Sequence, residues 1–160
     1  MNPAHVHLIL NHVPVVATGI GLLVLGAAML RGNPVLTRAA FWIFVLAAVA
    51  AIPTYLTGEP AEEIVEHLAG VSEAAIHEHE EAARITMPSM MLLGLTSSLG
   101  LFLMSRRSAV PRWLQVMVLA LGLVTFILMA RTANLGGMVH HFEIRDGSAQ
   151  PEAGSGSGGL

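Results

Sequence analysis

The fold is decided by the stretch AAFWIFVLAAVAAIPTYLT, Ala39 to Thr57, which carries no charged side chain. About 20 predominantly apolar residues in a helix are enough to cross the hydrocarbon core of a bilayer. Three further runs of this kind occur, so the predicted spans cover residues 3–30, 39–57, 85–104 and 113–134. The sequence therefore predicts an all-α integral membrane four-helix bundle.

Composition supports this class. The chain has 160 residues, of which 54% are hydrophobic and 12% charged, and its mean hydropathy is +0.66. Soluble domains are far less apolar. Four spans with short links occupy residues 1–145, which indicates one membrane domain embedded in the lipid bilayer. With a net charge of −3 and no basic patch, the chain is not expected to bind nucleic acid.

The absence of cysteine narrows the chemistry further. It excludes disulfides, thiolate-bound zinc, iron–sulfur clusters and covalently attached c-type haem.

The long connection between the second and third spans, residues 58–84, alternates glutamates with apolar residues. This spacing predicts one or two amphipathic helices on the membrane surface. Gly70 is expected to end the first and Ser72 to cap the second. The glycine- and serine-rich residues 146–160 are expected to form a disordered tail.

Proline and glycine predict two local features of the spans. Pro14 has no N–H to donate to the carbonyl of Leu10, so a bend is expected there. The pair Gly136–Gly137 is expected to end the fourth helix and let the chain turn back over the bundle.

The arginines predict the orientation. The short links 31–38 and 105–112 contain five of the eight basic residues. The positive-inside rule places such links in the cytoplasm. Both termini and residues 58–84 are then periplasmic, and the chain is a multi-pass protein of the bacterial inner membrane.

All eight histidines fall on that predicted periplasmic side. A histidine at membrane depth is costly and is therefore a functional candidate. The eight lie at the start of the first span, in the long connection and after the fourth span: His5, His7, His12, His67, His77, His79, His140 and His141. His67 is interpreted as a surface residue of an acidic helix.

The leading hypothesis is a b-type haem centre for electron transfer. Imidazoles from two helices are the usual ligands of such a haem. His12 and His79 are the favoured axial pair, with His7 and His141 as alternates. Arg131, in the last turns of the fourth span, could pair with a haem propionate, a quinone oxygen or a glutamate of the long connection. The haem would exchange electrons with quinol or a periplasmic carrier.

Two alternatives remain. The first is a non-haem site for a divalent transition metal (zinc, iron or copper), because imidazole and carboxylate together bind such ions. Its candidate ligands are His7, His12, His79, His141, Glu80 and Glu143. The second is a non-catalytic accessory subunit of a larger membrane complex, whose histidines form hydrogen bonds across the bundle.

Three stretches carry a resemblance: HVHLILNHVPV, TGEPAEEIVEHLAGVSEAAIHEHEEAA and RTANLGGMVHHFEIR. They resemble the signature stretches of an uncharacterised family of small bacterial four-helix membrane proteins. The resemblance implies a four-span fold and aligns His7, His12, Pro14, His79 and His141 with the family pattern. The family's last stretch usually reads R-H-P-E, and this chain differs around His141. The resemblance implies no particular activity.

Overall fold

The structure is a computed structural model that describes residues 3–65, 73–107 and 109–140. Its regular elements are all α-helices: α1 (Pro3–Leu10), α2 (His12–Arg31), α3 (Pro34–Leu56), α4 (Gly58–Val65), α5 (Glu73–Arg106) and α6 (Arg112–His140). The long helices α2, α3, α5 and α6 are each apolar enough to cross a membrane. The prediction of an all-α chain with four candidate spans is thus confirmed.

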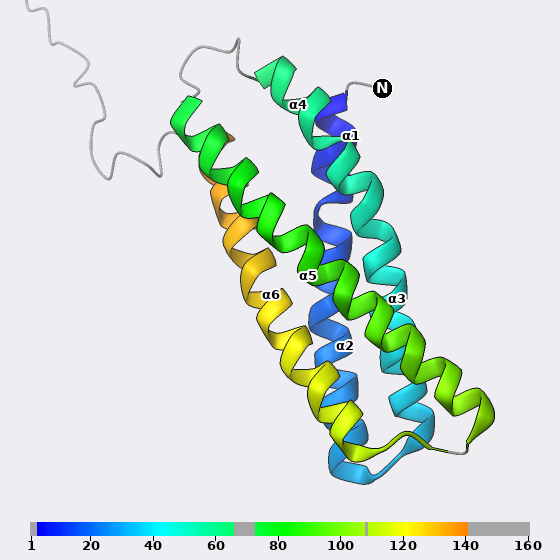
Figure 1. Ribbon diagram of the computed structural model, residues 1–160. Coiled ribbons are helices and arrows are strands. Elements are labelled where there is room, and N and C mark those ends of the chain that lie inside the picture. The colour runs from blue at the N-terminus through cyan, green and yellow to red at the C-terminus, as the bar shows by residue number, and fades with distance from the viewer. Residues whose placement is uncertain (1–2, 66–72, 108, 141–160) are drawn as a thin grey trace, which may run out of the picture.

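The four long helices pack side by side as a bundle (Figure 1). Helix α2 packs against α3 and α6, and α5 packs against the same two helices. The short helices α1 and α4 pack against each other at one end of the bundle. This arrangement brings the start of α5 beside the end of α6, which matters for the candidate site.

Small residues allow the helices to approach closely in the core. Phe41 and Phe44 of α3 are fully buried, and they face Gly100 of α5 and Gly21 of α2. Without a hydrophobic driving force between helices in lipid, such close packing is a main source of bundle stability.

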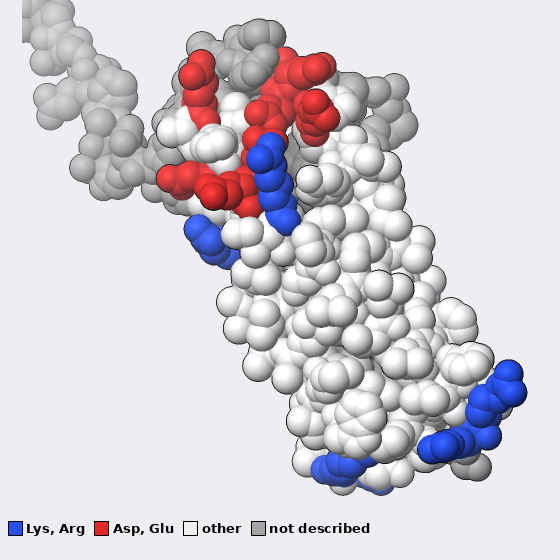
Figure 2. Space-filling model, in the orientation of Figure 1, with Lys and Arg blue, Asp and Glu red and all other residues white. Residues whose placement is uncertain are grey.

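The outer surface of the bundle is apolar. Leu30, Leu23 and Val35 are 89%, 77% and 73% exposed, and Figure 2 shows a broad uncharged surface between the two ends. In water an apolar surface of this extent would drive aggregation. It is suited to the hydrocarbon of a bilayer instead.

The first span differs from the prediction, because its helix breaks at Asn11 rather than bending at Pro14. The carbonyl of Leu10, which Pro14 cannot serve, accepts a hydrogen bond from Thr54 Oγ1 at 3.3 Å. Thr54 Oγ1 also lies 2.9 Å from the carbonyl oxygen of Ala50 in its own helix, so its single hydroxyl hydrogen is shared and replaces the missing backbone bond only in part. The sequence thus predicts a local disturbance of the helix near Pro14, but the helix breaks at Asn11, three residues before the proline.

Two predicted helix ends also differ. Residues 73–84 are not a separate surface helix, because α5 continues from Glu73 through the third span to Arg106. Helix α6 continues through Gly136 and Gly137 to His140, so the prediction that this pair ends the helix was wrong. Gly70, Ser72 and the tail 146–160 lie outside the described residues.

The two ends of the bundle carry different side chains. We call the end with α1, α4, the first turns of α5 and the last turns of α6 the histidine end. The end with the two short links, 31–38 and 105–112, is the arginine end. Figure 2 shows the described carboxylates gathered at the histidine end, where basic side chains lie beside them, whereas the opposite end carries basic side chains alone. Which side of a membrane each end faces stays a prediction.

Candidate functional site

Histidine side chains at the histidine end fall into two groups. His7 and His79 are half-buried and bond to other helices. His5, His12 and His77 are exposed. The backbone of His140 ends α6, whereas His67, His141 and Glu143 lie outside the described residues.

His7 connects α1 to α3. Its Nδ1 lies 3.0 Å from the carbonyl oxygen of Thr54 and 3.2 Å from Thr57 Oγ1. A carbonyl oxygen only accepts, so Nδ1 carries the hydrogen and donates it. His7 therefore has a structural contact across the bundle.

His79 connects α5 to α6 in the same way. Its Nδ1 lies 2.9 Å from the carbonyl oxygen of Thr132 and donates to it. The ring rests on Gly136, where an added Cβ would lie 3.0 Å from Cε1 of the imidazole. Glycine at this position thus permits the close approach of ring and helix. The bond also fixes the tautomer, so Nε2 of a neutral ring keeps its lone pair.

Hydroxyl groups extend this contact along the interface of α5 and α6. Thr86 Oγ1 lies 2.9 Å from Thr132 Oγ1, and Ser89 Oγ lies 2.7 Å from Thr125 Oγ1. Interhelical bonds of this kind contribute about 0.6 kcal/mol each in a membrane bundle. Together with His79 they set the register of the two helices at the histidine end.

His12 points away from the centre of the bundle. It shares a helix face with the exposed Val16 and Leu23, opposite the buried Thr18 and Gly21. Its Nδ1 lies 3.0 Å from the carbonyl oxygen of Leu8, one turn earlier, and donates to it. His12 thus has the same tautomer as His79, but the described residues show no contact between these two side chains.

Glu80 forms an ion pair with Arg84 at 3.0 Å, one turn further along α5. Both side chains are well exposed, so solvent screens the pair and its contribution to stability is small. Glu80 therefore has an ordinary surface partner in this structure.

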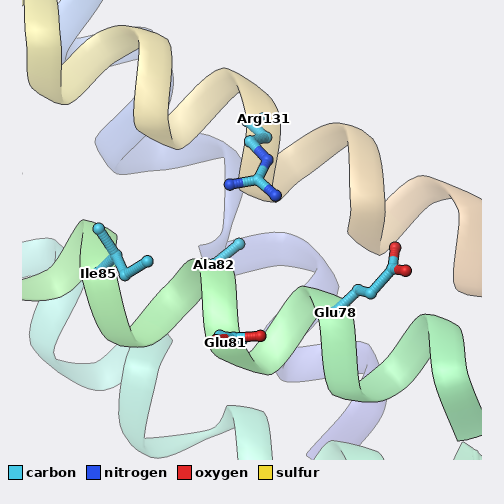
Figure 3. Close-up of a pocket in the computed structure, with 5 residues that line it drawn as sticks. All are labelled: Glu78, Glu81, Ala82, Ile85 and Arg131. Atoms are coloured by element: carbon cyan, nitrogen blue, oxygen red, sulfur yellow. The ribbon is translucent and has the colours of Figure 1, made fainter.

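Arg131 lines a groove between α5 and α6 (Figure 3). It reaches from α6 toward α5, and Glu78 reaches from α5 toward α6. Glu81, Ala82 and Ile85 complete a space of about 180 Å³, which is room for a few water molecules at about 30 Å³ each. The sequence placed Arg131 near glutamates of the long connection. The sequence alone does not identify Glu78 or Glu81 as the neighbours of Arg131, although their spacing of three residues puts them on one helix face.

Within residues 3–65, 73–107 and 109–140, no group of three or more histidine, aspartate or glutamate side chains is arranged to hold a metal ion. The described members of the non-haem set, His7, His12, His79 and Glu80, thus do not form a three-ligand site by themselves. The remaining two candidates, His141 and Glu143, are not among the described residues.

Comparison with known proteins adds no identification: no family model, no curated protein and no solved structure matches the chain. The resemblance of the three stretches therefore stays a prediction, and the structure supports only the four-span helical architecture that it implies.

Proposed function

We propose that this chain is a bacterial inner-membrane protein whose histidine end binds a b-type haem for electron transfer, with His79 as one axial ligand. The supporting observation is the bond from His79 Nδ1 to the Thr132 carbonyl oxygen. A ligating histidine almost always donates its second ring N–H to a carbonyl or carboxylate, which orients the ring and leaves the other nitrogen for the metal.

The donor chemistry of the other candidates fits the same group. His12, whose Nδ1 is bonded to the Leu8 carbonyl oxygen, is the proposed second ligand. Because its side chain points away from the centre of the bundle, it would have to turn toward His79 for both to bind one haem. His7 and His141 are the alternates. Haem bound by two imidazoles supplies one-electron chemistry, with quinol or a periplasmic carrier as the partner.

Arg131 has a separate role in this proposal. The groove beside it measures about 180 Å³, which suits a carboxylate group and not a porphyrin ring. A guanidinium binds a carboxylate through two parallel N–H bonds. Arg131 would therefore hold a haem propionate, in competition with the carboxylates of Glu78 and Glu81 that line the same groove.

A matched pair of variants tests the ligand assignment. In His79→Asn, the side-chain amide N–H replaces the Nδ1–H donor to Thr132, but no Nε2 remains. In His77→Asn, the same substitution is made at an exposed position of the same helix. Haem is titrated into each purified full-length protein in detergent and binding is followed by absorption.

We expect His79→Asn to weaken haem binding by about tenfold or more, and His77→Asn to bind as the wild type does. His12→Ala should also weaken binding or change the spectrum. Wild-type affinity in both His79→Asn and His12→Ala would contradict the assignment.

A second candidate function is favoured by a specific observation. His7 and His79 both bond across the bundle to backbone carbonyls, and such contacts stabilise a small accessory subunit without any cofactor. On this alternative, the wild type binds no haem, and His79→Asn behaves like the wild type because its cross-helix bond remains.

The non-haem metal site is tested in the same preparation. Elemental analysis of the purified protein reports bound zinc, iron or copper in the absence of haem. Loss of a carboxylate next to the metal, in Glu80→Gln or Glu143→Gln, should then lower metal affinity by about tenfold or more. A bis-imidazole haem needs neither carboxylate, so these variants separate the two kinds of site.

A further inference from the structure

The arginine end carries positive charge, and no acidic residue occurs in its two links or in the helix residues beside them. Its two links hold Arg31, Arg38, Arg106, Arg107 and Arg112, and no Asp or Glu occurs in residues 1–58 or 82–142. Figure 2 shows this end as blue and white, in contrast to the acidic opposite end. An anionic group from outside the chain would therefore meet no repulsion there.

Arg112 is held in a defined position at this end. Its Nη1 donates to the carbonyl oxygen of Met29, in the last turn of α2, at 3.1 Å. This bond uses one of the five N–H donors of the guanidinium. The others are in place to bind a second acceptor while the side chain stays anchored to α2.

A groove of about 200 Å³ lies next to Arg112, between the two links. It is formed by the end of α2, the start of α3 and the start of α6. Its lining residues include Gly32, Asn33, Thr37, Ala109, Arg112 and Gln115. The Asn33 Oδ1 atom already accepts hydrogen bonds from the N–H groups of Val35 and Leu36. This oxygen therefore competes little with an incoming anion for the Arg112 guanidinium.

The side chains around the groove place it at the membrane surface. Trp113, next to Arg112, is 63% exposed, and tryptophan is enriched at the level of lipid headgroups. Leu30, just before the first link, and Val35, within it, are 89% and 73% exposed. The polar groove is suited to a lipid headgroup, and the exposed apolar side chains beside it are suited to the acyl chains of the same lipid.

We propose that this groove binds the phosphate of an anionic phospholipid, with Arg112 as the main contact and the acyl chains along the apolar faces near Leu30 and Val35. Basic pockets between helices at a membrane surface are suited to such headgroups. The occupant is a lipid and not a free anion, because the apolar flanks continue directly from the groove. This inference is independent of the proposed haem.

The test uses the purified full-length protein, stripped of lipid in a neutral detergent. Phosphatidylglycerol or phosphatidylcholine is added, and native mass spectrometry measures the bound fraction. We expect tighter binding of phosphatidylglycerol. Arg112→Gln should weaken it by about tenfold, the effect of one lost hydrogen bond to a charged group. The control Arg107→Gln removes the same charge from an exposed position outside the groove lining and should weaken binding much less.

A second variant keeps the charge and fills the space. Ala109→Leu puts a larger side chain on an exposed position that lines the groove, and it should weaken phosphatidylglycerol binding as Arg112→Gln does. Equal losses in Arg112→Gln and Arg107→Gln would overturn the proposal in favour of nonspecific attraction. Equal binding of the two lipids, or complete displacement of phosphatidylglycerol by excess inorganic phosphate, would overturn it as well.

Discussion

His79 Nδ1 lies 2.9 Å from the carbonyl oxygen of Thr132, and this bond joins the first turns of α5 to the last turns of α6. The hydroxyl of the same threonine lies 2.9 Å from Thr86 Oγ1. Thr132 therefore contacts α5 through both its backbone and its side chain. The His79 ring is fixed by this double contact and by Gly136, against which it rests.

Replacing His79 separates its structural contact from any ligand role. His79→Leu removes the donor to Thr132 and should lower the free energy of unfolding by about 1–2 kcal/mol. His79→Asn keeps an N–H donor and should lose much less. Thermal unfolding in detergent measures both variants, with His77→Leu at an exposed position as the control. A His79→Leu protein as stable as the control would show that the bond contributes nothing.

Close packing of α3 against α5 predicts a strong effect at Gly94. A Cβ added there would lie 2.5 Å from the Cβ of Ala48, an overpacking that should cost about 1–3 kcal/mol. Gly94→Ala should therefore lower the unfolding temperature, and Ala48→Gly in the same chain should restore part of it. Gly26→Ala is the control, because nothing lies within 4 Å of a Cβ there. Additive effects in the double variant would contradict this contact.

The hydrogen bond from Thr54 to Leu10 predicts a coupling with Pro14. Thr54→Val removes the hydroxyl donor that the carbonyls of Leu10 and Ala50 share, and it should lower the free energy of unfolding by about 1 kcal/mol. Pro14→Ala supplies a backbone N–H one turn after Leu10, so the double variant should recover part of this loss. Chemical denaturation of the four proteins measures the coupling. A double variant less stable than Thr54→Val would argue against the proposed replacement of the backbone bond.

Because the chain contains no cysteine, single cysteines can test the orientation. Glu63→Cys lies at the histidine end and Ala109→Cys in a link, and both positions are exposed. A membrane-impermeant maleimide added to intact spheroplasts should label the first but not the second, as the positive-inside rule predicts. After permeabilisation both should be labelled. The reverse pattern would place the histidines in the cytoplasm.

Much of the fold could be predicted from the sequence, because each span is a long apolar run and requires no knowledge of its neighbours. The separation of the five link arginines from the histidines follows from the same four runs. The proximity of Arg131 to glutamates could also be anticipated, since both lie at the same end of neighbouring spans.

The details of the candidate site could not be predicted, because they depend on how α5 and α6 align. His79 and Thr132 are 53 positions apart in the chain, and no periodic pattern specifies their register. Gly136 illustrates the limit: glycine there suggested a helix end, whereas the structure uses it for close contact with an imidazole. The contact of Thr54 with the Leu10 carbonyl beside the break likewise joins residues of two helices that are 44 positions apart.

The most direct test of the central claim is the absorption spectrum of the purified wild-type protein, recorded before and after haem addition and then after reduction. The account predicts a Soret band that rises to one haem per chain, with the sharpened bands of a six-coordinate bis-imidazole haem on reduction. No protein-bound Soret band at any haem concentration would contradict the account and favour the cofactor-free accessory subunit or a non-haem metal site.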